Sequence, residues 1–216
     1  MQKIKAVIFD IDGTLGDTIP LCIQAFRQTV EPLVHHPLTD EEIKATFGPN
    51  EAGTIKKLAP GSDYNNAVND FLHHYEALHS MCPQAFDGMV DLLETLKSKG
   101  VHLAVATAKG KESSEITLQH FGIASFFSMV KNGSLDGKQK PGDIEQIIQS
   151  FGDVTKEETI YVGDSPSDIT DSRKAGVVAI AANWATTAEA SALEKEQPDE
   201  LFDKVSDFAD WLYNKI

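Results

Sequence analysis

Short, uninterrupted runs of apolar residues recur along this chain and restrict its possible folds more than any other feature. The first run is Ala6–Phe9, and similar runs span residues 101–106, 159–162 and 177–181, with a weaker run at 127–130. A short apolar run bounded by turn residues is typical of a strand that is buried on both faces of a parallel sheet. The runs therefore predict the strands of one such sheet.

Amphipathic helical patterns separate the later runs. Apolar residues recur on one helical face from residue 87 to 99, and Gly100 follows as a stop signal. Comparable patterns span residues 113–121, 143–151 and 168–175, and each is followed by a glycine. Strands that alternate with helices predict an α/β fold with a Rossmann-like, doubly wound parallel sheet.

The segment from about residue 18 to 80 departs from this alternation, because it contains no pattern of a buried strand. Four helices are expected there, at residues 20–34, 40–47, 50–58 and 64–79, with Thr39 and Asp63 as candidate caps. We predict an inserted α-helical cap domain, residues 18–82. The core would then be formed by residues 1–17 and 83–216.

Charge and composition narrow the range of partners. The 216-residue chain has 33 Asp and Glu residues against 19 Lys and Arg residues, a formal net charge of −14. Such acidity repels nucleic acid, which we do not expect as a partner. No apolar run approaches the roughly 20 residues of a membrane span, and no signal-peptide pattern precedes the first strand. Because Cys22 and Cys82 lie outside any paired motif, we expect a reduced, cytoplasmic protein.

Reactive residue types follow the predicted strands. The first strand ends in Asp10-Ile11-Asp12-Gly13-Thr14, the second in Thr107-Ala108-Lys109, and the fourth in Gly163-Asp164-Ser165-Pro166-Ser167-Asp168. Lys140-Pro141 lies between the third and fourth strands. Ligands of open α/β sheets bind beyond the carboxyl ends of the strands, so these residues are expected to face one crevice.

The first of these segments contains two carboxylates with separate predicted roles. Asp10, at the end of a rigid strand, is placed to attack phosphorus and form an acyl phosphate. Asp12 lies where the strand turns, and it is placed to protonate the leaving oxygen and later to activate water. Gly13 allows a close backbone approach to phosphate oxygens.

The other segments supply candidate metal and phosphate ligands. Asp164 and Asp168 are spaced to bring two hard oxygen ligands to one cation, and together with Asp10 they suit Mg²⁺. Thr107 offers a hydroxyl and an amide to the transferring group, and Lys140 offers a positive charge. Asp168 also has a simpler interpretation, as a cap of the helix that follows it.

These motifs, in this order, resemble those of the haloacid dehalogenase superfamily, in its phosphoglycolate phosphatase-like branch. The resemblance spans nearly the whole chain and implies a Rossmann-like core, a mobile helical cap and Mg²⁺. It implies Asp10 and Asp12 as catalytic residues. The implied metal-binding residues are Asp10, Asp12, Asp164 and Asp168, and the implied phosphate-binding residues are Gly13, Thr14, Thr107, Ala108 and Lys140.

Some segments depart from the family or have two interpretations. Many relatives have Asn where this chain has Ala108, which removes a polar contact. Residues 183–187 replace a Gly-rich turn that is common in the branch. Residues 47–50 form a turn between cap helices. In relatives a loop of this kind reaches the site and selects the substrate. Residues 47–50 are equally well interpreted as an ordinary connection between two helices. Lys109 likewise has two interpretations, either as a residue of the site or as a lysine with no role there.

The expected reaction is Mg²⁺-dependent hydrolysis of a small-molecule phosphate monoester, such as phosphoglycolate, a sugar phosphate or a nucleotide. A pyrophosphatase and a phosphomutase of the β-phosphoglucomutase type remain alternatives, although Thr14 favours a hydrolase. A catalytically silent binding protein is disfavoured because all four motif acids are present. The expected partner is a small phosphate ester rather than a membrane, and the expected state is a monomer or homodimer.

Overall fold

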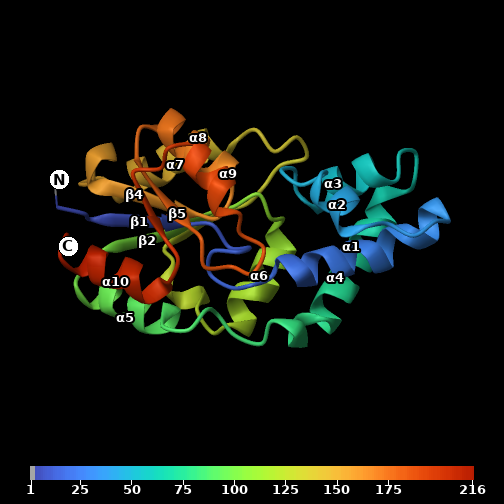
Figure 1. Cartoon of the computed structure of the whole chain (residues 1–216), viewed down its shortest axis with the longest axis horizontal. Helices are drawn as coiled ribbons and strands as arrows, with labels where there is room; N and C mark the ends of the chain where they lie inside the picture. Colours follow the sequence, from blue (N-terminus) through green and yellow to red (C-terminus); the bar gives the residue numbers. More distant parts are fainter. Residues whose placement is uncertain (1–2) are drawn as a thin grey trace.

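The computed structural model describes residues 3–216, and its central feature is a parallel sheet. Its described strands run in the order β3-β2-β1-β4-β5-β6, and every neighbouring pair is parallel (Figure 1). This order is that of a doubly wound sheet, as expected from the sequence. The strands are β1 (Ala6–Phe9), β2 (His102–Ala106), β3 (Met129–Lys131), β4 (Thr159–Gly163), β5 (Val178–Ala182) and β6 (Glu200–Phe202).

Strand β1 lies at the centre of the sheet, which explains its continuous apolar sequence. It pairs with β2 and β4, and Ile8 lies opposite Ala104 on one side and Tyr161 on the other. Val7 and Phe9 belong to one hydrophobic cluster, whereas Ile8 belongs to the cluster on the opposite face. Both faces of the strand therefore need apolar side chains.

Helices cover both faces of the sheet (Figure 1). Side chains of α5, α6 and α10 pack with Val7 and Phe9, and side chains of α7 and α8 pack with Ile8. The shorter helix α9 packs through Leu193 against β5. These helices are α5 (Met89–Ser98), α6 (Lys111–His120), α7 (Lys140–Phe151), α8 (Pro166–Ala175), α9 (Ala190–Lys195) and α10 (Val205–Tyr213).

A group of helices inserted after β1 lies at one end of the molecule (Figure 1). These helices enclose a hydrophobic cluster of their own, which includes Phe26, Ile55 and Phe71. As predicted, Thr39 and Asp63 cap helices through their side chains, and Thr39 forms a capping box. The helices are α1 (Ile19–Val34), α2 (Asp40–Lys44), α3 (Glu51–Leu58) and α4 (Tyr64–Ala77), followed by a 3₁₀ turn at His79–Met81. The cap boundaries at residues 18 and 82 stay a prediction.

Several element limits differ from those expected. Helix α7 begins at Lys140 rather than at residue 143, because Pro141 is well suited to the first turn of a helix. Strand β3 begins at Met129 rather than at residue 127, since residues 124–126 form a 3₁₀ turn. The prediction about a signal peptide falls partly on residues 1 and 2, which lie outside the described chain. Among the residues described, no helix is long and apolar enough to cross a membrane.

Candidate active site

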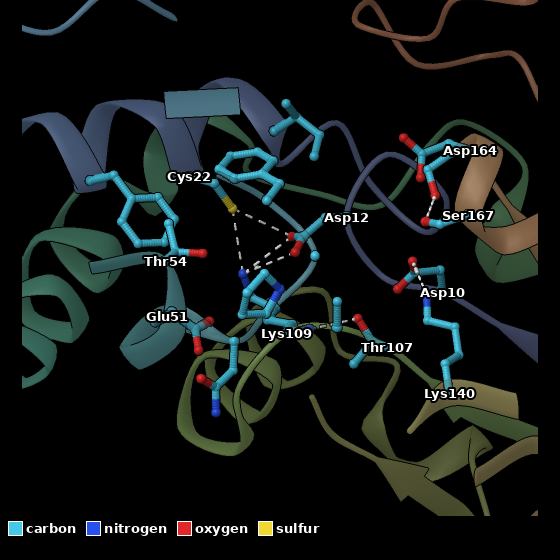
Figure 2. Close-up of a pocket in the computed structure, with 18 of the residues that line it drawn as sticks. Asp10, Asp12, Cys22, Glu51, Thr54, Thr107, Lys109, Lys140, Asp164 and Ser167 are labelled. Carbon is cyan, nitrogen blue, oxygen red and sulfur yellow. Dashed lines mark hydrogen bonds and ion pairs between the residues drawn. The ribbon is translucent and has the colours of Figure 1, made fainter. Parts of the chain in front are cut away.

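Asp10 lies at the carboxyl end of β1, inside a pocket between the sheet and the inserted helices (Figure 2). Its amide donates a hydrogen bond to the carbonyl of Val162 at 2.9 Å, which continues the strand pairing. The side chain is buried, and its Oδ1 accepts a hydrogen bond from the amide of Ile11 at 2.7 Å. Burial raises the pKa of Asp10 to about 6, although Lys140 acts in the opposite direction.

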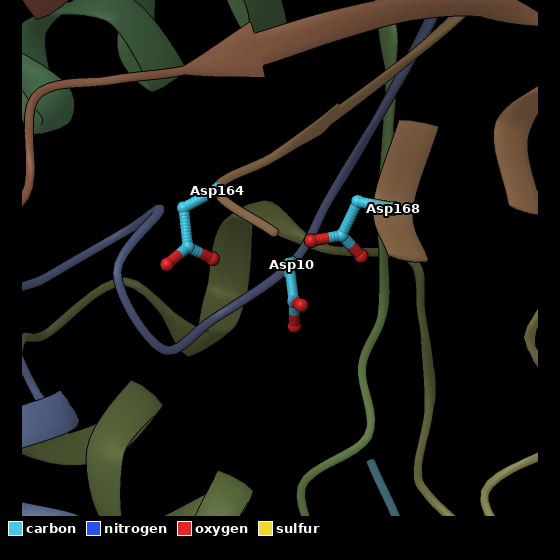
Figure 3. A group of neighbouring side chains, drawn as sticks. All are labelled: Asp10, Asp164 and Asp168. Carbon is cyan, nitrogen blue, oxygen red and sulfur yellow. The ribbon is translucent and has the colours of Figure 1, made fainter. Parts of the chain in front are cut away.

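Three carboxylates converge at this point. Oxygens of Asp10, Asp164 and Asp168 lie within 4.8 Å of one another, and Figure 3 shows the three side chains converging. Asp10 follows β1, Asp164 follows β4, and Asp168 lies in the first turn of α8. Burial, and then the neighbouring charge of Asp168, raises the pKa of Asp164 well above its usual value. Three hard oxygen donors that are costly to bury as free anions fit a divalent cation such as Mg²⁺.

Lys140 joins two of these acids from the first residue of α7. Its Nζ lies 3.0 Å from Asp10 Oδ2 and 2.6 Å from Asp168 Oδ1. Burial alone would lower the pKa of Lys140, but the two carboxylates raise it well above its usual value. Asp168 also accepts a bond from the amide of Ser165 at 3.0 Å, so it both caps α8 and contacts the site.

Asp12 stands apart from the three-carboxylate cluster. Its carboxylate pairs with Lys109 Nζ at 3.2 and 3.3 Å, and it accepts a hydrogen bond from the Thr18 hydroxyl at 2.5 Å. Lys109 is buried and points toward Asp12 (Figure 2), and its Nζ lies 4.0 Å from the centre of the Tyr75 ring of α4. Burial lowers the pKa of Lys109, whereas Asp12 raises it, and the net result is well above the usual value. A metal contact of Asp12 stays a prediction.

The predicted phosphate-binding residues surround Asp10. Gly13 has a φ of 74°, and a Cβ at this position would overlap the carboxylate of Asp164, so only glycine fits. The Thr14 hydroxyl donates a long hydrogen bond of 3.4 Å to Asp164. Thr107 and Ala108 line the same pocket as Asp10. The structure thus brings these residues together, while their contacts with phosphate stay predictions.

The pocket is a cavity of about 250 Å³ with two chemically different walls. The sheet side presents the motif residues, and the inserted helices present a largely apolar wall that includes Ile19, Phe26, Phe47 and Phe71. Residues 47–50 line the pocket, and their role in substrate selection stays a prediction. Sequence reasoning left Lys109 open and missed Glu51 and Tyr75, because their partners lie on elements distant in sequence. The only available signal was the proximity of Lys109 to Thr107.

Residues 7–182 match the family model of the haloacid dehalogenase-like hydrolases. Because the match covers most of the chain, the protein belongs to this family, which agrees with the motifs and the fold.

Similar proteins extend the likeness over nearly the full length. The pyrophosphatase PpaX of Halalkalibacterium halodurans is 29% identical over 213 residues, which are 97% of each chain. A haloacid dehalogenase-like family protein from Streptococcus pneumoniae is 25% identical, with a TM-score of 0.77 over 96% of this chain and 98% of that chain. A structure described as a predicted phosphoglycolate phosphatase from Haemophilus somnus is 21% identical, with a TM-score of 0.76 and complete coverage of both chains.

Proposed function

We propose that the protein is a Mg²⁺-dependent phosphohydrolase that transfers a phosphoryl group from a small molecule to Asp10 and then to water. One observation carries this proposal: a buried carboxylate at a strand end lies within 4.8 Å of two further carboxylates and 3.0 Å from a lysine. An acid cluster of this kind supports metal-assisted phosphoryl transfer, in which positioned charges contribute most of the catalysis.

In the first step, an Asp10 oxygen attacks phosphorus and the bond to the leaving oxygen breaks. Asp12 donates a proton to that oxygen. Lys140 holds Asp10 in place and presents positive charge beside the transferring oxygens. A Mg²⁺ ion held by Asp10, Asp164 and Asp168 would supply further positive charge to the phosphoryl group.

In the second step, Asp12 removes a proton from water, which attacks the aspartyl phosphate at phosphorus. The bond between phosphorus and the Asp10 oxygen breaks, so inorganic phosphate is released and the carboxylate is restored. The distinct surroundings of the two acids support this division of roles. Asp10 faces the acid cluster, whereas Asp12 faces Lys109 and the inserted helices.

The size of the pocket supports a small substrate, because about 250 Å³ accommodates a metabolite and no folded partner. Phosphate monoesters such as phosphoglycolate, sugar phosphates and nucleotides fit this range. Pyrophosphate is a second candidate, and the likeness to proteins named pyrophosphatase PpaX favours it. We further propose that the protein acts in the cytoplasm as a monomer or homodimer.

Phosphate release tests this proposal directly. The native chain would be compared with Asp10→Asn on pyrophosphate, phosphoglycolate, sugar phosphates, nucleotides and an aryl phosphate, with and without Mg²⁺. We expect Mg²⁺-dependent turnover that falls by about 10³-fold or more in Asp10→Asn. Asp210→Asn changes an exposed carboxylate on α10 in the same way and should retain activity. Equal rates for the native and Asp10→Asn chains would contradict the mechanism.

A further inference from the structure

Glu51 is a buried carboxylate that the reaction described above does not use. It is the first residue of α3, and it reaches from the inserted helices to the beginning of α6 in the core. Its Oε2 accepts a hydrogen bond from the Gly110 amide at 2.8 Å, and its Oε1 accepts one from the Ser113 hydroxyl. Figure 2 shows Glu51 beside Lys109 at the edge of the pocket.

Around Glu51, the inserted helices and the loops of the core lie in close contact. A Cβ on Gly110 would overlap the Glu51 carboxylate, and a Cβ on Gly53 would overlap the backbone of Leu135. The amide of Asn50 donates a hydrogen bond to the carbonyl of Ser134 at 2.9 Å. Glycines at these positions allow the beginning of α3 to approach two core loops closely.

The partner of Glu51 directly follows the predicted phosphate-binding segment. Thr107 and Ala108 line the pocket, Lys109 pairs with Asp12, and Gly110 is the N-cap of α6. The free amides at the start of a helix attract a negative charge, which Glu51 provides. One carboxylate from the inserted helices therefore holds the backbone at the end of a segment that lines the pocket.

We propose that Glu51 is a positioning residue that holds the inserted helices against the core and thereby sets the position of the segment from Thr107 to Gly110. The kinetic part of this inference, the effect of Glu51 on turnover, rests on the proposed phosphohydrolase function. The structural part, that Glu51 holds the inserted helices against the core, is independent of activity. When Glu51 leaves Gly110, the helices separate from the core and the phosphate-binding segment loses its support.

The separation of the inserted helices from the core can be measured in the absence of substrate, as the rate at which Cys22 is alkylated. Cys22 on α1 is buried, with its Sγ 3.5 Å from Lys109 Nζ across the same interface. Alkylation would be followed by peptide mass spectrometry, with Cys82 as an internal reference. We expect Glu51→Ala to accelerate modification of Cys22 by about tenfold, because the lost bonds involve a charged group. Glu51→Gln, which keeps an accepting oxygen, should show a smaller effect.

The matched control is Glu76→Ala, which removes an exposed glutamate from α4 and should leave the Cys22 rate unchanged. A Cys22 rate in folded Glu51→Ala within twofold of the native rate would overturn the structural part of the proposal. Glu51→Gln keeps the same test available where Glu51→Ala does not fold.

Kinetics and chemical rescue test the positioning role. On the best substrate, Glu51→Ala should raise KM and lower kcat, and added formate or acetate should restore part of kcat by occupying the vacated place beside Gly110. The anions should not stimulate the native chain or Glu76→Ala. Faster Cys22 modification with unchanged kcat and KM would overturn the positioning role. Failure of the native chain to hydrolyse any phosphate would instead count against the proposed function, while the Cys22 result would still decide the structural part.

Discussion

At the end of β1, the backbone of Gly13 lies against the carboxylate of Asp164. The positive φ of Gly13 and the overlap expected for a Cβ there leave no space for a larger residue. We predict that Gly13→Ala displaces Asp164 from the acid cluster and lowers Mg²⁺ affinity and turnover by at least about tenfold. Isothermal titration with Mg²⁺ and phosphate-release assays would measure the two losses.

Gly142→Ala is the matched control for this prediction. Gly142 lies in α7 with no neighbour within 4 Å of an added Cβ, so alanine is expected to keep activity and to stabilise the helix by about 0.5–1 kcal/mol. Similar Mg²⁺ affinities for the native chain and Gly13→Ala would show that Asp164 is not held by this contact.

The sequence could predict the site residues at strand and helix ends, but not those that depend on the contact between the inserted helices and the core. Asp10, Asp164 and Lys140 stand at fixed positions relative to strand ends and a helix start, so topology alone brings them together. Lys109 and Glu51 depend on how the inserted helices meet the core, and their partners lie up to 97 residues away in sequence. No local pattern specifies such an orientation.

At the scale of elements, the segment at residues 183–187 has a clear structural role. It follows β5, and the indole Nε1 of Trp184 donates a hydrogen bond to the carbonyl of Thr14 at 3.0 Å. The hydroxyl of Thr186 donates to Asp17 Oδ2 at 2.7 Å. These bonds hold the turn between β1 and α1.

We predict that Trp184→Phe destabilises the protein by about 1–3 kcal/mol, because the carbonyl of buried Thr14 loses its partner. Urea unfolding would measure this change. Trp211→Phe provides the matched control, since its indole donates to Glu200 at the surface, where water can replace the lost bond. Equal losses of stability in the two variants would contradict a special role for Trp184.

The sequence predicted the strands that are buried on both faces of the sheet, but it did not predict β6 at the edge. The runs that gave β1, β2, β4 and β5 are apolar because helices cover both faces of the sheet. Strand β6 is short and only partly buried, and its Glu200 is exposed, so it lacks that pattern. Its place at the edge is set by pairing with β5, which is a tertiary contact rather than a local preference.

At the scale of the whole molecule, the acid cluster connects metal binding to folding. The protein has a net charge of −14, and it gathers Asp10, Asp164 and Asp168 at one point, where Lys140 pairs with Asp10 and Asp168. Burial raises the pKa of Asp10 from 3.8 to about 6 and that of Asp164 well above 3.8, so the metal-free folded state holds protons that the unfolded state releases. Lys140 counters the effect of burial and lowers the pKa of Asp168, whose contribution to stability is therefore complete above about pH 5.

The sign of the pH dependence follows from these shifts. Between pH 5 and 8 the metal-free folded state holds more protons on Asp10 and Asp164 than the unfolded state does, so their contribution to the free energy of unfolding falls as pH rises, by about 1.4 kcal/mol for Asp10. Mg²⁺ requires the deprotonated carboxylates, so it should restore stability at pH 8, by about 2.7 kcal/mol at a hundredfold excess over Kd, and have little effect at pH 5. Thermal unfolding across this range, with EDTA or Mg²⁺, measures both trends. Asp10→Asn should make the metal-free decline shallower, whereas Asp210→Asn should not. An equally steep metal-free decline in the native chain and in Asp10→Asn would contradict the raised pKa of Asp10.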